Sequence, residues 1–228
     1  MIATMSRKLL TSQKVVESAA GLFLSKGFNA VSMDQIAAKA GVTKVTVYQH
    51  FRSKELLLAA CLRWRLERRE SSLDRLLAGE TSPFKKFAAL FAWMEKNAAT
   101  GGFCGCAFLK AAAEVSAFHA QVREIALEAK RRMRRRCTKL AGEALSVDPI
   151  RTGQVISLLI EGAQSWSLLE RSATPFRIAR NRVEEMLTRR TYSPADPPVS
   201  PRRGLSSRKR VRSRKRSYAS SPSVRTKR

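Results

Sequence analysis

Residues 31–58 read VSMDQIAAKAGVTKVTVYQHFRSKELLL, and this stretch decides the fold because it holds three helix starts in fewer than thirty residues. Ser32 is followed three residues later by Gln35, a capping box in which each side chain satisfies a backbone N–H of the other residue. Gly41 can adopt the positive φ that ends a helix. The pattern therefore predicts a first helix that starts near Met33 and ends at Gly41.

A second short helix follows at once. Thr43 is a good N-cap for it, and Val47 and Phe51 lie four residues apart, so both are expected to face inward. Ser53 caps a third helix with Glu55 in its first turn, where a carboxylate favours the positive helix end. We interpret residues 32–51 as a helix-turn-helix.

The outward side of the second helix consists of hydrogen-bond donors and one valine, with no acidic residue among them. Its members are Lys44, Val45, Thr46, Tyr48, Gln49 and His50. Such a surface suits phosphate oxygens and base edges. Two short helices also form αα-hairpins in proteins that bind no DNA, and that alternative stays open from the pattern alone.

From Leu9 to about Leu62 the chain resembles the TetR (tetracycline repressor) family, through VVESAAGLFLSKGF, IAAKAGVTKVTVYQHF and SKELLL. The resemblance implies an amino-terminal three-helix DNA-binding domain on an all-helical body that dimerises and holds an inducer pocket. It also implies DNA contacts at Thr43, Lys44, Thr46, Tyr48 and His50, and a phosphate contact at Lys54.

Together with the pattern, the resemblance gives nine candidate DNA-binding residues: Ser32, Thr43, Lys44, Val45, Thr46, Tyr48, Gln49, His50 and Lys54. Lys44, Val45, Thr46 and Gln49 are expected to read base edges, and Thr43, Tyr48, His50 and Lys54 to fix the backbone register. Many relatives have a small residue at the position of Val45. Its side chain either packs on a thymine methyl or only tightens the helix turn.

The body is expected to be all-α, because no segment alternates with period two. A capping residue precedes proline at Ser82, Asp148 and Thr174, which marks three helix starts. We predict about nine helices. These are two short ones in the helix-turn-helix and seven longer ones at 11–25, 54–76, 83–99, 104–115, 117–141, 149–171 and 175–190. The expected divisions are residues 9–62 for DNA binding, 63–192 for effector binding and dimerisation, and 193–228 for a disordered basic tail.

The helix over 149–171 is apolar on two sides. One side holds Val155, Leu158, Leu159, Gly162, Trp166 and Leu169, and the other Ile156, Ile160, Ala163 and Ser167. One side is expected to cover the core and the other a second copy of the chain, together with Phe176, Ala179, Val183 and Leu187 of the next helix. Symmetric operators favour such a homodimer over the alternative, a core helix in a monomer.

Large apolar residues on the middle helices predict a pocket for a small-molecule effector of unknown identity. The predicted lining is Phe91, Met94, Phe103, Phe108, Glu114 and Trp166, and Trp93, Phe118 and Glu161 lie in the same context. Alternatively, each aromatic is plain core and both acids face water.

The composition argues against several other classes. Cys61, Cys104, Cys106 and Cys137 lack the spacing of a zinc or disulfide framework, and we expect reduced, mostly buried thiols. The sequence indicates no catalytic arrangement, metal site or cofactor, so we do not expect an enzyme. No apolar run approaches the length of a membrane helix, which favours a cytoplasmic protein without membrane contact.

Charge is the feature that the resemblance does not explain. The 228 residues carry a net charge of +26, of which +11 lies in residues 193–228, a Pro-, Ser- and Arg-rich stretch that has little to bury. This tail is either an arm that raises non-specific DNA affinity or an extension without function. The second function that the sequence allows is therefore an architectural or non-specific nucleic-acid-binding protein. Within the body, six cations in residues 130–136 indicate a crowded solvated helix face.

Overall fold

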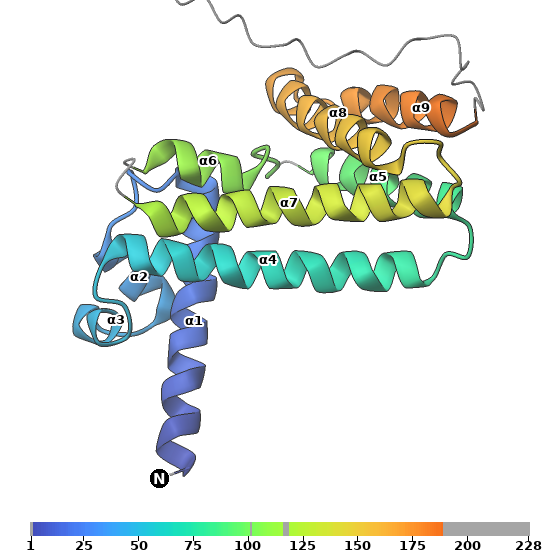
Figure 1. Cartoon of the computed structure of the whole chain (residues 1–228). Helices are drawn as coiled ribbons and strands as arrows, with labels where there is room; N and C mark the ends of the chain where they lie inside the picture. Colours follow the sequence, from blue (N-terminus) through green and yellow to red (C-terminus); the bar gives the residue numbers. More distant parts are fainter. Residues whose placement is uncertain (1, 101, 116–118, 189–228) are drawn as a thin grey trace, which may run out of the picture. The chain divides into compact units, whose positions relative to one another are not determined.

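The computed structural model describes residues 2–100, 102–115 and 119–188, with side chains from residue 8 onward (Figure 1). All regular structure in these ranges is helical, as predicted. The described residues belong to one compact unit, Met1–Thr191. The helices are α1 Ile2–Lys26, α2 Met33–Ala40, α3 Lys44–His50, α4 Lys54–Ala78, α5 Pro83–Ala98, α6 Ala107–Glu114, α7 Ala120–Glu143, α8 Pro149–Glu170 and α9 Thr174–Thr188.

Helix boundaries differ from the predictions where a local interaction was not visible in the sequence. α1 begins nine residues before Thr11, and α6 begins three residues after Cys104, because Gly105 has a φ of 72° that no helix continues through. Of the three predicted caps before proline, only Asp148 makes the side-chain bond, to the N–H of Arg151 at 2.9 Å. Ser82 makes none, and Ser172 rather than Thr174 accepts the first N–H of α9.

Two hydrophobic cores lie one after the other along α4 and α7. The first core joins α1, α2, α3 and α6 to the first half of α4 and of α7. The second core joins α5, α8 and α9 to the second half of the same two helices. α4 and α7 lie side by side and run in the same direction (Figure 1). Both cores are therefore aligned by one pair of helices.

α7 and α8 make the most extensive helix contact in the described chain. Gly153 permits this contact, because a Cβ built there would lie 2.6 Å from the backbone of Thr138. Real Cβ atoms do not approach that closely, so any side chain at residue 153 would push the two helices apart. Of the two predicted apolar sides of α8, the contact buries the one that contains Ile156 and Ile160, both of which are fully buried.

The prediction for α9 was wrong. Phe176, Ala179 and Val183 are buried in the second core, and Leu187 packs against it, so these residues do not form a surface for a second chain. α9 has to cover α5 and α8, and this contact uses its apolar side. Leu159 packs against the second core, although it was grouped with the side of α8 that contains the exposed Leu158 and Leu169.

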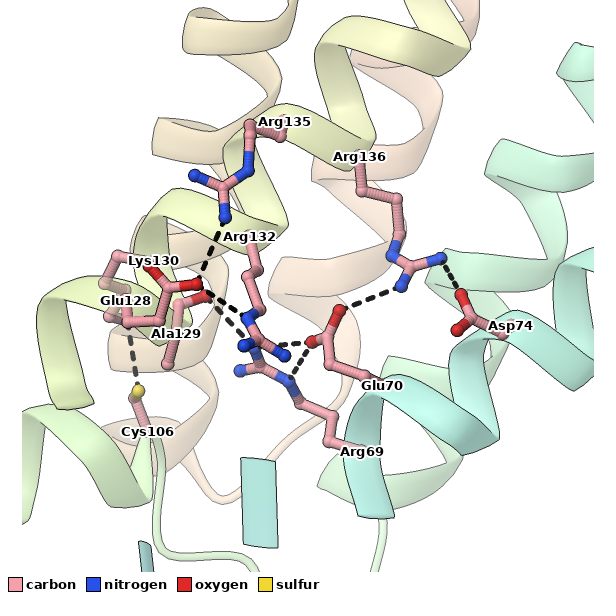
Figure 2. Close-up of polar contacts among 10 residues, drawn as sticks. All are labelled: Arg69, Glu70, Asp74, Cys106, Glu128, Ala129, Lys130, Arg132, Arg135 and Arg136. Atoms are coloured by element: carbon pink, nitrogen blue, oxygen red, sulfur yellow. Dashed lines mark hydrogen bonds and ion pairs between the residues drawn. The ribbon is translucent and has the colours of Figure 1, made fainter. Parts of the chain in front are cut away.

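The basic cluster at 130–136 is only in part the predicted solvated face: Arg131, Arg134 and Arg135 are exposed, whereas other members form ion pairs with neighbouring helices (Figure 2). Arg136 bridges two turns of α4, with contacts of 2.9 Å to Glu70 and 2.7 Å to Asp74. Arg69 donates to the carbonyl of Ala129 at 3.0 Å and also contacts Glu70. Lys130 pairs with Glu161 of α8. The cations of α7 thus connect it to helices on both sides.

Arg136→Met should lower the free energy of unfolding by roughly 2 kcal/mol. The side chains of Arg136 and Glu70 are only 17% and 14% exposed, so Glu70 would lose one of its two cations in a place that water reaches poorly. Its remaining contact with Arg69 keeps the loss below that of a fully broken buried pair. Urea unfolding followed by circular dichroism measures the difference.

The matched control is Arg135→Met, which removes the same charge from the neighbouring position. That side chain is 63% exposed, so its pair with Glu128 should contribute less than about 0.5 kcal/mol. Equal losses in the two variants would show that net charge, and not the bridge between α4 and α7, sets the stability.

Candidate DNA-binding site

The turn between α2 and α3 is fixed by backbone and side-chain caps. Ser32 accepts the N–H of Gln35 at 3.2 Å, and Gln35 accepts the N–H of Ser32 at 3.0 Å, so the predicted capping box is present. Gly41 has a φ of 63°, and its N–H reaches the last carbonyls of α2. A rigid two-helix unit follows from these few polar contacts.

One side of α3 packs in the first core, and the opposite side is exposed. Thr43 caps it by accepting the N–H of Thr46 at 3.1 Å, and Val47 is fully buried in the first core. The exposed candidates are Thr43, Lys44, Val45, Tyr48 and Gln49, while Thr46 and His50 are half-buried. Val45 is 67% exposed, so its side chain is not needed to tighten the helix in this structure. The structure brings these seven candidates together on one short surface.

Asp34 is the polar residue at this surface that the sequence analysis missed. Its carboxylate lies 2.9 Å from the ammonium of Lys44, and both side chains are exposed. The hydrogen bond that Lys44 donates to Asp34 raises the pKa of Lys44 above its usual value, so Lys44 stays cationic. Its place in the first turn of α2, ten residues away in sequence, gave no signal because only the turn geometry brings the two together.

Lys54 lies at the first turn of α4 and is already engaged within the chain. Its ammonium donates to the carbonyls of Phe28 at 3.0 Å and Val31 at 3.1 Å, and it lies 4.3 Å from the centre of the Phe28 ring. An ammonium has three N–H donors, so one remains for an outside acceptor. The visible role of Lys54 is to fix the α1–α2 loop against α4. Its predicted phosphate contact stays a prediction.

A cavity of about 440 Å³ lies within the body, between α4, α5 and the loop before α6. Met94, Phe103 and Phe108 line it as predicted, together with Trp93. This volume is within the range of small-molecule sites in proteins.

Three predicted lining residues are elsewhere, which corrects the pocket prediction. Phe91 is fully buried in the second core, and Trp166 is 60% exposed on the outer side of α8. Glu114 accepts the N–H of Phe28 and so ties α6 to the end of α1. Glu161 is engaged with Lys130, and Phe118 lies outside the described residues. Spacing along the sequence did not reveal which side of each helix faces the cavity.

The four cysteines divide into two classes. Cys61 and Cys137 are buried, and burial raises the pKa of each thiol to about 12, which keeps it protonated. Cys104 and Cys106 are half-buried and line the cavity, contrary to the expectation of mostly buried thiols. Burial raises the pKa of Cys104, and Lys130 donates to the sulfur of Cys106 at 3.0 Å. In the described ranges, no three His, Cys, Asp or Glu side chains gather as metal ligands would.

Comparison with known proteins agrees with this geometry. The family model for bacterial regulatory proteins of the tetR family matches residues 15–61, which run from α1 into α4. The Transposon Tn10 TetC protein of Escherichia coli is 50% identical over 56 residues, and the transcriptional repressor KstR2 of Mycolicibacterium smegmatis is 31% identical over 88. These alignments cover 25% and 39% of this chain and only 28% and 43% of those relatives.

The fold extends the likeness beyond the amino-terminal region. The crystal structure of a TetR-family transcriptional regulator from Streptomyces coelicolor superimposes with a TM-score of 0.69 at 24% identity, covering 78% of this chain and 94% of that one. No helix within the described ranges combines the length and apolar character needed to cross a lipid bilayer. Residues 15–61 thus match the domain that defines the tetR family of bacterial regulatory proteins, and the described helices have the same fold as a TetR-family regulator.

Proposed function

We propose that this chain is a transcription regulator that binds a palindromic operator as a homodimer and represses until an effector releases it. The observation that carries the proposal is the outer surface of α3, where Thr43, Lys44, Tyr48 and Gln49 present donors while Val47 anchors the helix in the first core. A short helix anchored in this way can enter a major groove without losing its packing.

The division of roles among the nine candidates follows from their exposure. Lys44, Val45 and Gln49 project from the free side of α3 and are proposed to read base edges, with half-buried Thr46 beside them. Thr43, Tyr48, His50 and Lys54 are proposed to hold phosphates. The hydroxyl oxygen of Ser32 accepts the N–H of Gln35, so its O–H group can still donate to a phosphate oxygen.

Gln49→Ala should relax the preference at particular base pairs by about 1–3 kcal/mol, because a bidentate contact to adenine would be lost. Tyr48→Phe should instead weaken binding to every duplex by a similar factor, because a phosphate contact carries no sequence information. Duplexes selected from a random pool by the full chain, then titrated by fluorescence anisotropy, measure both effects.

Gln121→Ala, at an exposed position of α7, is the matched control and should leave both quantities unchanged. The same titration distinguishes a sequence-specific regulator from an architectural nucleic-acid-binding protein. Removal of residues 193–228 takes away none of the residues described in the two cores, so a specific regulator should keep its preferred duplex, whereas an architectural protein should lose nearly all binding. Loss of all binding in the shortened chain would exclude the proposed function.

Asp34→Asn should tighten DNA binding roughly fivefold at low salt, and the gain should shrink as salt rises. The carboxylate of Asp34 pairs with the ammonium of Lys44 and also repels phosphates. Its removal should therefore strengthen DNA binding for both reasons. The control is Glu67→Gln, which removes one negative charge from an exposed position of α4. Weaker binding by Asp34→Asn would mean that the ion pair orients Lys44 for the groove.

The outer side of α8 supports the proposed dimer. Val155, Leu158, Trp166 and Leu169 follow one another at helical spacing, and Leu158 and Leu169 are 69% and 76% exposed. Gly162 lies between them with open space around it, which lets a second helix approach closely. An exposed apolar stripe of this kind marks a contact between chains, and α8 on a two-fold axis would pair with itself.

Leu158→Glu should raise the dimer dissociation constant by at least about tenfold, because each copy would bring a charge into the centre of the contact. Sedimentation of the full chain over micromolar concentrations measures it. Leu109→Glu places the same charge at an exposed apolar position of α6 and should have no effect. A wild-type chain that stays monomeric at tens of micromolar would exclude the dimer.

A further inference from the structure

The cavity described above has a charge pattern that apolar packing does not explain. Its wall contains Arg65, Arg68 and Arg69 of α4, and no aspartate or glutamate among the described residues lines it. Arg69 is neutralised by Glu70 and donates to the carbonyl of Ala129. Arg69 therefore has partners within the protein for its charge and its hydrogen bonds.

Arg65 and Arg68 have no carboxylate partner within the described residues. The guanidinium of Arg68 lies 4.9 Å from the centre of the Trp64 ring, and Arg65 makes no hydrogen bond in this part of the chain. The two residues are three positions apart on one helix, so their side chains lie on the same side. Two uncompensated cations thus share one wall of the cavity, with Arg65 half-buried and Arg68 exposed.

The rest of the cavity wall is largely apolar, with four uncharged polar residues, Ser72, Asn97, Thr100 and Gln164. Trp93, Met94, Phe103 and Phe108 supply aromatic and thioether surface. Gln164 of α8 also lines the cavity, and its Oε1 atom is buried without a hydrogen-bond partner in the described structure. A buried acceptor without a donor is costly, and a ligand hydroxyl or N–H would satisfy it.

From this arrangement we infer that the cavity binds an anionic small molecule with a largely aromatic or aliphatic body. Its acid group, a carboxylate, sulfonate or phosphate monoester, lies against Arg65 and Arg68, where planar guanidinium groups offer paired donors. Its body packs on the aromatic wall, and a donor on it reaches Gln164. The inference deepens the proposed function, because it gives the effector of that regulator a chemical class.

Two fluorescent probes with the same aromatic body test the inference. 1-Anilinonaphthalene-8-sulfonate carries a sulfonate, and N-phenyl-1-naphthylamine lacks it. The full wild-type chain should bind one equivalent of the anionic probe at least about tenfold more tightly than the neutral probe, because charge-assisted hydrogen bonds form with one probe alone. Arg65→Gln/Arg68→Gln should remove this preference and change the affinity for the neutral probe less than about twofold.

The matched control is Arg131→Gln/Arg134→Gln, which removes two exposed cations from α7 and should leave both affinities unchanged. Arg65→Gln alone gives up no hydrogen bond or ion pair within the described chain, so it tests the inference even where the double variant fails to fold. It should cost about threefold in affinity for the anionic probe. The inference is overturned by equal affinities of the wild type for the two probes, by an equal loss in the control, or by no loss in Arg65→Gln.

DNA titration of the same proteins separates this inference from the function on which it rests. A chain that binds its selected duplex but shows no preference for the anionic probe overturns the ligand class alone. A chain that prefers the anionic probe but ignores every duplex overturns the proposed regulator and leaves the anion site standing.

Discussion

The parallel contact of α4 with α7 is the constraint on which the rest of the described structure depends. These two helices alone among the described ones supply residues to both hydrophobic cores. The helix-turn-helix packs on the first half of α4, the cavity lies along the middle of α4, and α8 packs on the second half of α7. Arg136 and Arg69 add polar contacts where one core passes into the other, so the register between α4 and α7 is fixed by ion pairs as well as by packing.

The helix-turn-helix could be predicted from the sequence because its determinants are local. The capping box of Ser32, the positive φ of Gly41 and the cap of Thr43 each depend on residues at most four positions apart, and all three are present in the structure. The ion pair of Asp34 with Lys44 was not predicted, because it arises only when the turn brings α2 and α3 together. Likewise, Lys54 contacts carbonyls of a loop more than twenty residues earlier in the chain.

The body was predicted less well because tertiary contacts decide it. Six cations in seven residues indicated a solvated face, yet acids on α4 and α8 turn two of them, Lys130 and Arg136, into bridges between helices. Both apolar sides of α8 were identified from the spacing of their residues. Nothing in the local sequence showed that the apolar side of α9 packs in the same core. The pocket prediction was incomplete for the same reason. The aromatic residues could be identified in the sequence, but the arginines of the cavity were not predicted, because charged residues are usually solvated.

The positions of Arg65 and Arg68 on α4 connect the two proposals physically. At 1.5 Å per residue, Arg65 lies about 17 Å along the helix from Lys54, which holds the loop before α2. An anion bound at the arginines and a phosphate bound near Lys54 would therefore act on one rigid element that packs in both cores. Coupling between them would require that the anion bind one arrangement of the two helix-turn-helix units of the proposed dimer more tightly than the other. Linkage then demands that operator DNA change the affinity for the anion by the same factor that the anion changes the affinity for DNA.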